Sequence, residues 1–467
     1  MPGTFFGINT ALRGLEAAQT AMDVTSHNIS NVSTPGYSRQ IADLQTTDPL
    51  DNPVMPPGGV GELGSGVTVA SVTRAHDDFI QQQIVYQNGV QAQQQTLSDT
   101  LSGVGQVYND PSSQGFSTLL SNFFTSWQQL ANNPSDNASR VAVVGRATNL
   151  AAGFNAAASS LQEMQGNADK QVGGFVQQIN TITGQIADLN KQIAVVTATG
   201  QQPNDLADTR DTLITTLSSL ANITYNKDAN GMVSVSLAGA GPIVSGITTT
   251  KLATAPNGAN PGFSDVVFEG QTTRLSIGGG QLGGALYARD RTLTDQLSQL
   301  RGLAQNVMSA VNTIHQGGYD KNGAAGQPFF TLTPDSKMQV NPTIAGDPSL
   351  VAAGKTANSP EDGDNASAIA RLQESPASAS GQTVTLQAQY AGMISALGVA
   401  GQQALSNVRT GGLVLQHLNA QQSSVSSVSL NEEASNLLRY QHAYEAAARV
   451  ISIMDQTIGD MIQKLGG

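Results

Sequence analysis

The sequence predicts a mainly α-helical protein: a long helical bundle whose N- and C-terminal helices pair as a coiled coil, plus a small inserted β domain. Three observations lead to this prediction. Apolar residues recur at three- and four-residue spacings near both ends of the chain, Gln-, Ala- and Leu-rich stretches with helical spacing fill most of the middle, and one Thr- and Val-rich stretch alternates as strands do. The 467 residues are enough for about three domains and a large core.

The N-terminal stretch indicates one amphipathic helix that ends near Asn31. Its apolar residues follow a three-four spacing that Gln19 and Ser26 interrupt. They are Phe5, Ile8, Leu12, Leu15, Met22 and Ile29. A helix with one apolar face cannot bury that face by itself, so we expect it to need a partner, and the C-terminal helix is the nearest candidate.

The segment NISNVSTPGYSRQ, residues 28–40, predicts a sharp turn directly after this helix. Pro35 fixes its own φ and pushes Thr34 towards an extended conformation. Gly36 can adopt the positive φ that the third position of a type II turn requires. We therefore expect the chain to reverse its direction here.

Polar residues at the helix end favour the same turn. Asn28 and Asn31 can hydrogen-bond the carbonyl and amide groups that a helix end leaves free, and Tyr37 can fold back onto the helix. The N-terminal candidate residues for subunit packing are Asn28, Asn31, Thr34, Pro35, Gly36 and Tyr37.

The C-terminal stretch keeps the heptad pattern of a coiled coil from Leu430 to Leu465, and only Glu433, at a seam position, breaks it. Such a helix would be about 54 Å long at 1.5 Å per residue, too long to lie wholly against a compact body. We therefore expect neighbouring subunits to cover part of its seam. The C-terminal candidate residues for subunit packing are Leu437, Tyr440, Tyr444, Ile451, Met454, Ile458, Met461 and Leu465.

The stretch between the termini contains a linker and a helical body. Residues 41–74 are rich in Pro and Gly and then alternate as VTVASV, which indicates a loop followed by a short strand. Residues 75–221 have helical spacing broken at NDPSSQG, NNPSDN and TGQQPND, so we expect three or four long helices. The helical pattern resumes from Ala285 to about His315, and again from Gln387 after an irregular stretch.

Residues 223–277 change character and predict the inserted β domain. The run ITYNKDANGMVSVSL contains two strand-like segments around Asn230-Gly231, a signal for a two-residue hairpin. We expect the ends of the insert to lie close together. The predicted organisation is an N-terminal coiled-coil segment (1–45) that pairs with a C-terminal one (420–467), a helical body with its linker (46–221 and 285–419), and the β insert (222–284).

The composition excludes several classes of function. Charged residues make up 12% of the chain, the formal net charge is -12 and the sequence pI is about 4.7, so we expect no nucleic-acid partner. The absence of cysteine excludes disulfides, thiolate metal sites and cysteine nucleophiles. Residues 1–30 lack the apolar core of a cleavable signal peptide, and no run is apolar enough to cross a bilayer, so we expect no membrane insertion.

Two motifs bear on cofactor and cation binding. GGGQLGG contains a formal GxGxxG but has no parallel βαβ unit around it, which favours a turn that re-enters a helix. In PNDLADTRD, Asp205, Asp208 and Asp211 recur every third residue and could bind a hard cation on one helical face. The favoured interpretation is a helix start, capped by Asn204 or Asp205 and partly compensated by Arg210.

Other catalytic and metal-binding motifs are weak or missing. NKDANG has the spacing of a calcium loop from Asn226, but Leu237 stands where the bidentate Glu is required, so the segment indicates a turn. No His pair has metal-ligand spacing, and neither GxSxG nor GxxxxGK[ST] is present. We therefore predict no metal, no cofactor and no catalytic residue, and we do not expect an enzyme.

Both ends of the chain resemble the axial proteins of the bacterial flagellum, the rod, hook and hook-associated proteins. NISNVSTPGYSRQ is similar to their N-terminal signature, and SLNEEASNLLRYQHAYEAAARVIS, residues 429–452, resembles the C-terminal signature of the hook-associated protein 1 family. DLADTRDTL and GGGQLGGALYARD also resemble internal segments of that family. Ser30 and Ser33 stand where Ala and Asn are expected, and the β insert matches little.

The resemblance implies a structural adaptor of the flagellum, secreted through the flagellar type III export apparatus, that polymerises at the distal end of the hook and forms the hook–filament junction. The implied partners are copies of the chain itself, the hook protein, a second junction protein and an export chaperone that binds the C-terminal helix. Each large seam residue gains about 1.5–3 kcal/mol on burial, whereas ordering each backbone residue costs about 1–2 kcal/mol. We therefore expect both terminal helices to be disordered in the free monomer and to fold on assembly.

Two other classes of function stay open at this point. A hook or distal rod axial protein would share the TPGY turn but should lack the long helical region from Ala75 to Ala221. A secreted coiled-coil effector or adhesin should bind a host or surface ligand rather than the end of a hook.

Overall fold

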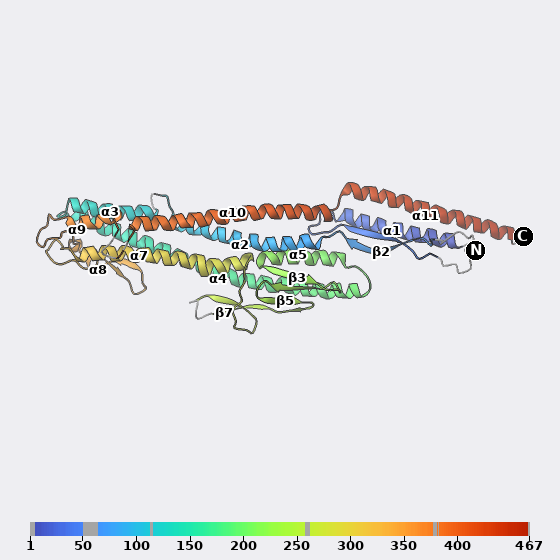
Figure 1. The fold of residues 1–467 in the computed structure, drawn as a ribbon, viewed down its shortest axis with the longest axis horizontal. Helices are drawn as coiled ribbons and strands as arrows, with labels where there is room; N and C mark the ends of the chain where they lie inside the picture. Colours follow the sequence, from blue (N-terminus) through green and yellow to red (C-terminus); the bar gives the residue numbers. More distant parts are fainter. Residues whose placement is uncertain are drawn as a thin grey trace.

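The computed structural model shows a long, thin rod with both chain termini at one end (Figure 1). Helices α1 (Phe6–Ser30) and α11 (Leu430–Leu465) project from a helical body at that end, and the short helices α8 (Pro342–Gly346) and α9 (Asp364–Ala370) lie at the opposite end. A β segment lies along one flank of the body (Figure 1). This architecture confirms the predicted mainly α-helical fold class. The described residues are 5–49, 64–112, 115–256, 262–376, 381 and 383–465.

Four long helices lie within residues 75–221, as predicted, and the three predicted breaks separate them. They are α2 (Asp78–Tyr108), α3 (Phe116–Asn132), α4 (Asn137–Ala198) and α5 (Asn204–Leu220). Asp77 and Asp136 cap α2 and α4, because each carboxylate accepts two free amides at the helix start. With 62 residues, α4 is about 93 Å long at 1.5 Å per residue, so it forms the main strut of the rod.

Two further long helical runs complete the body. The first is α6 (Gly280–Tyr287), which continues through a π-helical turn (Ala288–Thr292) into α7 (Leu293–Gln316); the second is α10 (Leu386–Ser426). The first run begins at Gly280 rather than at the expected Ala285, because the last glycines of the glycine-rich turn already belong to the helix. The irregular stretch between α7 and α10 contains small elements that periodicity did not predict. They are β9 (Phe330–Leu332), β10 (Met338–Val340), α8, α9 and 3-10 turns at Pro348–Leu350 and Arg371–Gln373.

The apolar core of the body is densest where α3 and α4 meet the loops that follow α7. Phe123, Trp127 and Phe329 contact one another there, and each side chain is fully buried. Leu161 and Val307 extend the same core along α4 and α7. The body therefore has a close-packed core of its own.

The β segment consists of two antiparallel sheets that lie against α4. Val235 and Ile243 share one apolar core with Val176 of α4 and Leu217 of α5. The strands therefore pack into the body along one side. The first sheet has the order β3 (Ile223–Lys227), β4 (Val233–Leu237), β5 (Gly241–Ser245), β6 (Thr248–Thr249), and the second pairs β7 (Leu252–Pro256) with β8 (Ser264–Phe268).

The β3–β4 hairpin differs from the two-residue turn predicted at Asn230-Gly231. Asp228 N donates to Met232 O, so three residues close the turn instead of two. The Asp228 carboxylate accepts the amides of Asn230 and Met232, which stabilises the longer turn. Only Gly231 of the pair has a positive φ, of 78°, whereas the predicted turn requires it at both residues.

The two ends of the β segment meet, as expected. Gly279 lies against Asn222, and Gly280, with φ of 65°, lies against the backbone of Ala221. The glycines of GGGQLGG thus allow two backbone segments to approach closely at the start of α6. The exact domain boundaries stay a prediction.

Part of the expected linker is a β-hairpin. β1 (Gln40–Thr46) pairs antiparallel with β2 (Val67–Arg74). β2 is the strand that the sequence predicted, whereas the expectation of a loop at β1 was wrong. Its apolar residues Ile41 and Leu44 are both exposed, so the usual alternation of a half-buried strand is missing. Residues 50–63 of the linker lie outside the described residues.

Candidate functional site: the terminal helix pair and its joint

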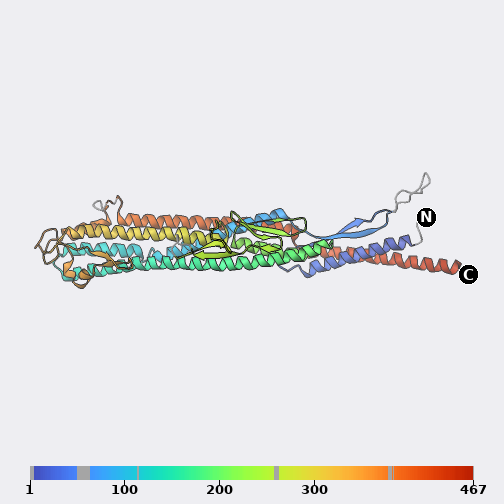
Figure 2. The ribbon, with the colours of Figure 1, turned by 90° about the horizontal axis from the view of Figure 1, so that it is seen from below.

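Helices α1 and α11 pair antiparallel at the end of the rod (Figures 1 and 2). Gly14 of α1 lies against Ala447 of α11. Asn28, two heptads after Gly14 on α1, hydrogen-bonds Glu433, two heptads before Ala447 on α11. Contacts spaced by whole heptads on both helices are typical of a coiled coil, so the predicted pairing of the two termini is confirmed.

The seam of α11 faces α1 but is incompletely buried. Met461 is 46% exposed near the free end of the helix, and the side chain of Leu465 lies outside the described residues. The single chain therefore leaves much apolar surface of this helix uncovered. The half-buried seam residues among the candidates are Leu437, Tyr440, Tyr444, Ile451, Met454 and Ile458.

The face of α1 that meets α11 consists of small side chains, which corrects the expectation from apolar spacing. Phe5 and Leu12 were predicted to lie on the buried face, but they are 65% and 44% exposed. Large residues of α11 fill the space between the helices, so a second row of large residues would keep the backbones apart. The buried residues of α1 are Ala17, Ala18, Ala21, Thr25 and Asn28.

The turn after α1 has the predicted geometry. Tyr37 N donates to Thr34 O at 3.2 Å, Pro35 holds the second position, and Gly36 at the third has φ of 80°, which fits a type II turn. A side chain at Gly36 would also collide with Thr212 Oγ1 of α5. Glycine is therefore required both for the backbone conformation and for the close approach to the body.

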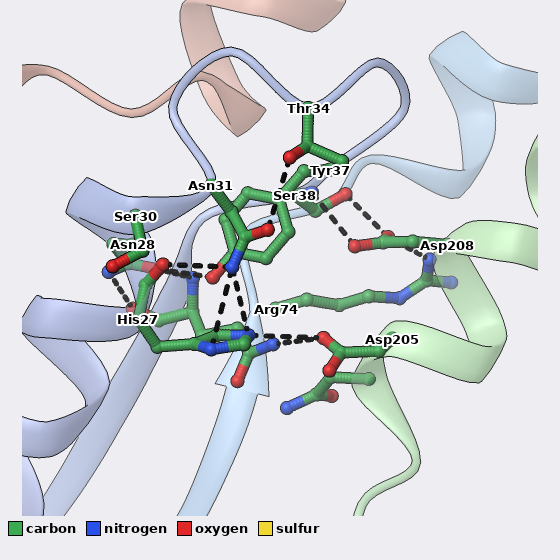
Figure 3. Close-up of polar contacts among 12 residues, drawn as sticks. His27, Asn28, Ser30, Asn31, Thr34, Tyr37, Ser38, Arg74, Asp205 and Asp208 are labelled. Atoms are coloured by element: carbon green, nitrogen blue, oxygen red, sulfur yellow. Dashed lines mark hydrogen bonds and ion pairs between the residues drawn. The ribbon is translucent and has the colours of Figure 1, made fainter.

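The region where the end of α1, the turn at residues 34–37, β1 and α11 meet is called the joint. Asn28 is buried in it (Figure 3). Its Oδ1 accepts hydrogen bonds from Tyr37 Oη and Gln40 N, both at 2.8 Å. Its Nδ2 donates to Gln40 O at 2.8 Å and to Glu433 Oε2 at 3.1 Å. One side chain thus links the helix end, the turn, β1 and α11, rather than capping its own helix as expected.

Asn31 and Tyr37 close the end of α1 as predicted (Figure 3). Asn31 Nδ2 donates to His27 O at 3.0 Å, and its Oδ1 accepts from Thr34 Oγ1 at 3.1 Å. The Tyr37 ring folds back to within 5.5 Å of the His27 ring, edge to face. Burial and nearby carboxylates raise the pKa of Tyr37, so its hydroxyl stays a neutral donor to Asn28.

Glu433, which interrupts the heptad pattern, is the acidic partner in this joint. Its side chain is buried, and its Oε1 accepts from Arg39 Nε at 2.7 Å while Oε2 accepts from Asn28. The adjacent Glu432 is exposed and accepts from Arg39 Nη1 at 3.1 Å. Arg39 N donates to Ser426 O at 2.9 Å. A buried charge in the seam is thus fully paired.

Asp208 of α5 anchors the joint to the body (Figure 3). It accepts from Ser38 N at 2.8 Å, from Ser38 Oγ at 2.7 Å and from Arg74 Nη1 at 2.8 Å. Arg74 also pairs with Asp211 at 2.7 Å. Burial opposes the charge of Arg74, but the two carboxylates raise its pKa above the usual value. Two of the acidic residues on the predicted face therefore bind an arginine.

The start of α5 differs from the predicted cap. Pro203 is the N-cap residue and makes no side-chain hydrogen bond, while Asn204 Nδ2 donates to Val72 O of β2. Arg210 is buried, donates to Gly231 O and lies 3.8 Å from Asp211 Oδ1, so it compensates the acidic residues in part, as predicted. Arg74 of β2 makes the shorter ion pairs, with Asp208 and Asp211. Among the described residues, no group of three His, Cys, Asp or Glu side chains is arranged to hold a metal ion.

Several residues of the joint were missed from the sequence. Two signals could have found them: the polar, basic tail SRQ directly after the turn, and an acidic residue at a seam position, because a buried carboxylate requires a partner. None of the helices in the described part of the chain is apolar over a length that would cross a bilayer. The missed joint residues are Ser38, Arg39, Gln40, Arg74, Asp208 and Glu433.

The paired terminal helices, the TPGY turn and the elongated helical body define an axial protein of the bacterial flagellum. Residues 8–37 match the family described as "Flagella basal body rod protein", and residues 421–464 match "Flagellar basal body rod FlgEFG protein C-terminal". Residues 101–330 match "Flagellar hook-associated protein FlgK helical domain". Together with a relative that is 30% identical over the whole chain, these matches show that the chain belongs to the flagellar hook-associated protein 1 family.

Similar proteins support this assignment. Flagellar hook-associated protein 1 of Bacillus subtilis is 30% identical over 515 residues, which cover 100% of this chain and 99% of that protein. The Escherichia coli protein of the same name is 32% identical over 75% of this chain and 63% of its own length. The structure of the flagellar hook junction protein FlgK from Burkholderia pseudomallei has a TM-score of 0.62 at 20% identity, covers 73% of this chain and 100% of that one, and shows the same fold.

Proposed function

We propose that the chain polymerises at the distal end of the flagellar hook as the structural adaptor of the hook–filament junction. As a member of the hook-associated protein 1 family, it has a structural role in the bacterial flagellum. The observation that carries the proposal is the uncovered apolar surface of α11. Leu438, Ile453 and Ile462 lie outside the heptad seam and are 58%, 58% and 65% exposed. Neighbouring copies would cover this surface.

The proposed assembly places the terminal helix pairs of many copies in the inner layer of a tube. The helical body surrounds that layer and the β segment faces outwards, which is supported by its position on the flank of the body (Figure 1). The candidate residues of the turn and seam would pack subunits together. The proposed partners are copies of the chain, the hook protein and a second junction protein.

We also propose that the chain is secreted through the flagellar export apparatus with the help of a chaperone. An unfolded passage suits a chain without cysteine. A chaperone groove could cover the apolar seam of α11 before assembly, as other grooves bind amphipathic helices. The same seam would then contact the chaperone first and the helices of the assembled junction afterwards.

The proposed role is non-enzymatic and requires no metal or cofactor. The charged side chains of the joint support it, because Asp208 and Glu433 are engaged by hydrogen-bond donors that connect segments of the chain. A catalytic activity that survives removal of both termini would contradict this part of the proposal.

Electron microscopy of isolated hooks incubated with the purified protein tests the proposal. We expect binding at one distal end only. Binding along the hook, or no binding, would contradict a junction role, and selective binding to a host or surface ligand would favour the effector or adhesin class. Buffer-treated hooks and hooks incubated with a chain that lacks residues 420–467 are the controls.

Limited proteolysis tests whether the terminal helices fold on assembly. Residues at both ends, about forty at each, should be removed from the free monomer and protected in the assembled form, because isolated one-faced helices are marginal in water. Terminal amides that are already protected from hydrogen exchange in the dilute monomer would refute this expectation.

A further inference from the structure

The face that α1 offers to α11 is nearly smooth. Gly7 lies against Met454, and Gly14 and Ala21 follow at heptad spacing on the same helix. Side chains this small form shallow holes of similar shape, so a large residue of α11 finds comparable room at each level. Apolar packing alone therefore discriminates weakly between neighbouring pairing registers.

A shifted register needs no unfolding of either helix. The seam of α11 recurs every three and four residues, so a displacement by one helical turn, about 5 Å, brings seam residues to face α1 again. Residues 427–429 connect α10 to α11 and lie outside both helices. This connection can lengthen or shorten when the last turn of α10 or the first turn of α11 unwinds or forms, so it can accommodate a shift of α11 by one turn. Something other than the seam must set the register.

The polar contacts at the joint discriminate between pairing registers, whereas the seam does so only weakly. Glu433 is 1% exposed and receives hydrogen bonds from Arg39 and Asn28. Arg39 cannot follow a moving α11, because its backbone is tied to Ser426 O and to Ala75 N. With Tyr444 opposite Gly14, the Glu433 carboxylate would face Thr25 of α1. With Ile451 opposite Gly14, it would lie level with Val32, past the end of α1 at Ser30. In both shifted registers it would be separated from Asn28 and Arg39. An unpaired buried carboxylate is strongly disfavoured.

We propose that Asn28, Arg39 and Glu433 form a polar lock that selects the register in which α11 pairs with α1. Glu433 is the specificity-determining residue, because its charge is tolerated in the seam only where both partners are present. The inference concerns the chain's own helix pairing, so it holds whether or not the chain polymerises at a hook.

Disulfide capture measures the register directly, because the chain contains no cysteine. A Cβ at Gly14 would lie 4.0 Å from the Cβ of Ala447, within the range for a disulfide, so Gly14→Cys with Ala447→Cys reports the observed register. Gly14→Cys with Tyr444→Cys reports a shift of three residues, and Gly14→Cys with Ile451→Cys a shift of four. Each pair is placed in the full-length chain, and the rate of cross-linking under mild oxidation is measured. Cross-linking captures the helix pair even where it opens and closes.

With Glu433 present, the observed-register pair should cross-link at least about tenfold faster than either shifted pair. In the Glu433→Leu background, the shifted pairs should rise to within about threefold of it, because the penalty on shifted registers is gone. Glu445→Leu is the control: it removes an exposed carboxylate of α11 that contacts none of the three lock residues, and it should leave the ratios unchanged. The fluorescence of Trp127, the single tryptophan, checks that the body is folded in every variant.

Three results would overturn the lock. One is equal cross-linking of shifted and observed pairs in the chain that keeps Glu433. Another is a Glu433→Leu chain that still forms the observed pair alone. The third is loss of all three cross-links in Glu433→Leu while Trp127 fluorescence is unchanged, which would assign Glu433 to pairing as such rather than to register.

Discussion

The body of the rod and its terminal helix pair are stabilised in different ways. In the body, Phe123, Trp127 and Phe329 are each 0% exposed and contact one another. In the terminal pair, α1 buries small residues such as Ala18 and Ala21. Burial of apolar surface is the main stabilising term, so a single chain supplies most of the stabilising contacts of the body but not those of the helix pair. One region therefore stabilises the fold of the single chain, and another region provides the surface that contacts neighbouring chains.

The joint between the two regions differs from both, because polar contacts dominate it. Asn28, Asp208 and Glu433 each connect segments that are far apart in the sequence. Hydrogen bonds contribute modestly to stability but depend strongly on geometry. Such a joint sets the placement of the helix pair on the body more than it adds to the free energy of unfolding.

The largest effect should come from the core of the body. Phe329→Ala should lower the free energy of unfolding by about 3–5 kcal/mol, because it removes a fully buried aromatic ring and leaves a cavity. Urea unfolding followed by Trp127 fluorescence measures the change. The matched terminal variant Leu438→Ala, at a 58% exposed position, should change it by less than about 0.5 kcal/mol. Equal effects would contradict the contrast between the two regions.

The next effect concerns pH and is confined to the body. His315 is buried, Nδ1 lies 2.6 Å from Gln327 O, and Nε2 accepts from Ala352 N at 2.9 Å. Burial lowers the pKa of His315 to about 4, so the unfolded chain binds a proton there before the folded chain does. Its stabilising contribution is present above pH 6.5 and is lost as the pH falls towards 4, by up to about 3 kcal/mol.

Urea unfolding at several pH values between 7 and 4 tests this prediction. His315→Gln should lose the histidine part of the pH dependence, whereas His417→Gln, at an exposed position on α10, should keep it. An unchanged slope in His315→Gln would show that other groups cause the pH dependence.

A smaller effect is expected at the turn. Gly36→Val should cost roughly 1–2 kcal/mol in the joint, because a β-branched residue disfavours the positive φ, and the new side chain also meets Thr212. Incorporation at the distal end of the hook, scored by electron microscopy, should fall. Gly64→Val is the control, because nothing lies within 4 Å of a Cβ there. Normal incorporation of the Gly36 variant would make our account of the TPGY turn wrong.

The smallest effect on the body should come from the seam. Tyr444→Asp places a charge on a half-buried seam position of α11, so we expect it to abolish assembly. The unfolding midpoint reported by Trp127 should stay unchanged, because the two residues lie in separate regions. A lowered midpoint would show that the helix pair and the body unfold as one unit.

Much of the fold could be predicted because helices and turns depend on local sequence. The breaks at NDPSSQG, NNPSDN and TGQQPND combine residues that end or start helices, and all three separate helices in the structure. Pro35 and Gly36 favour one turn type whatever lies nearby. The hairpin at Asn230-Gly231 was less predictable, because the Asp228 carboxylate stabilised a different turn.

The sequence by itself determined the long helices, the turn after the first of them and the heptad seam of the last, because periodicity and backbone preferences act within a few residues. The tertiary structure alone decided which face of α1 is buried, that β1 forms and pairs with β2, and which groups pair with Glu433. Those outcomes depend on the shape and charge of segments that meet only after folding. Small residues were buried on α1 since α11 already supplied the large ones, and a carboxylate was accepted in the seam since Asn28 and Arg39 were held opposite it.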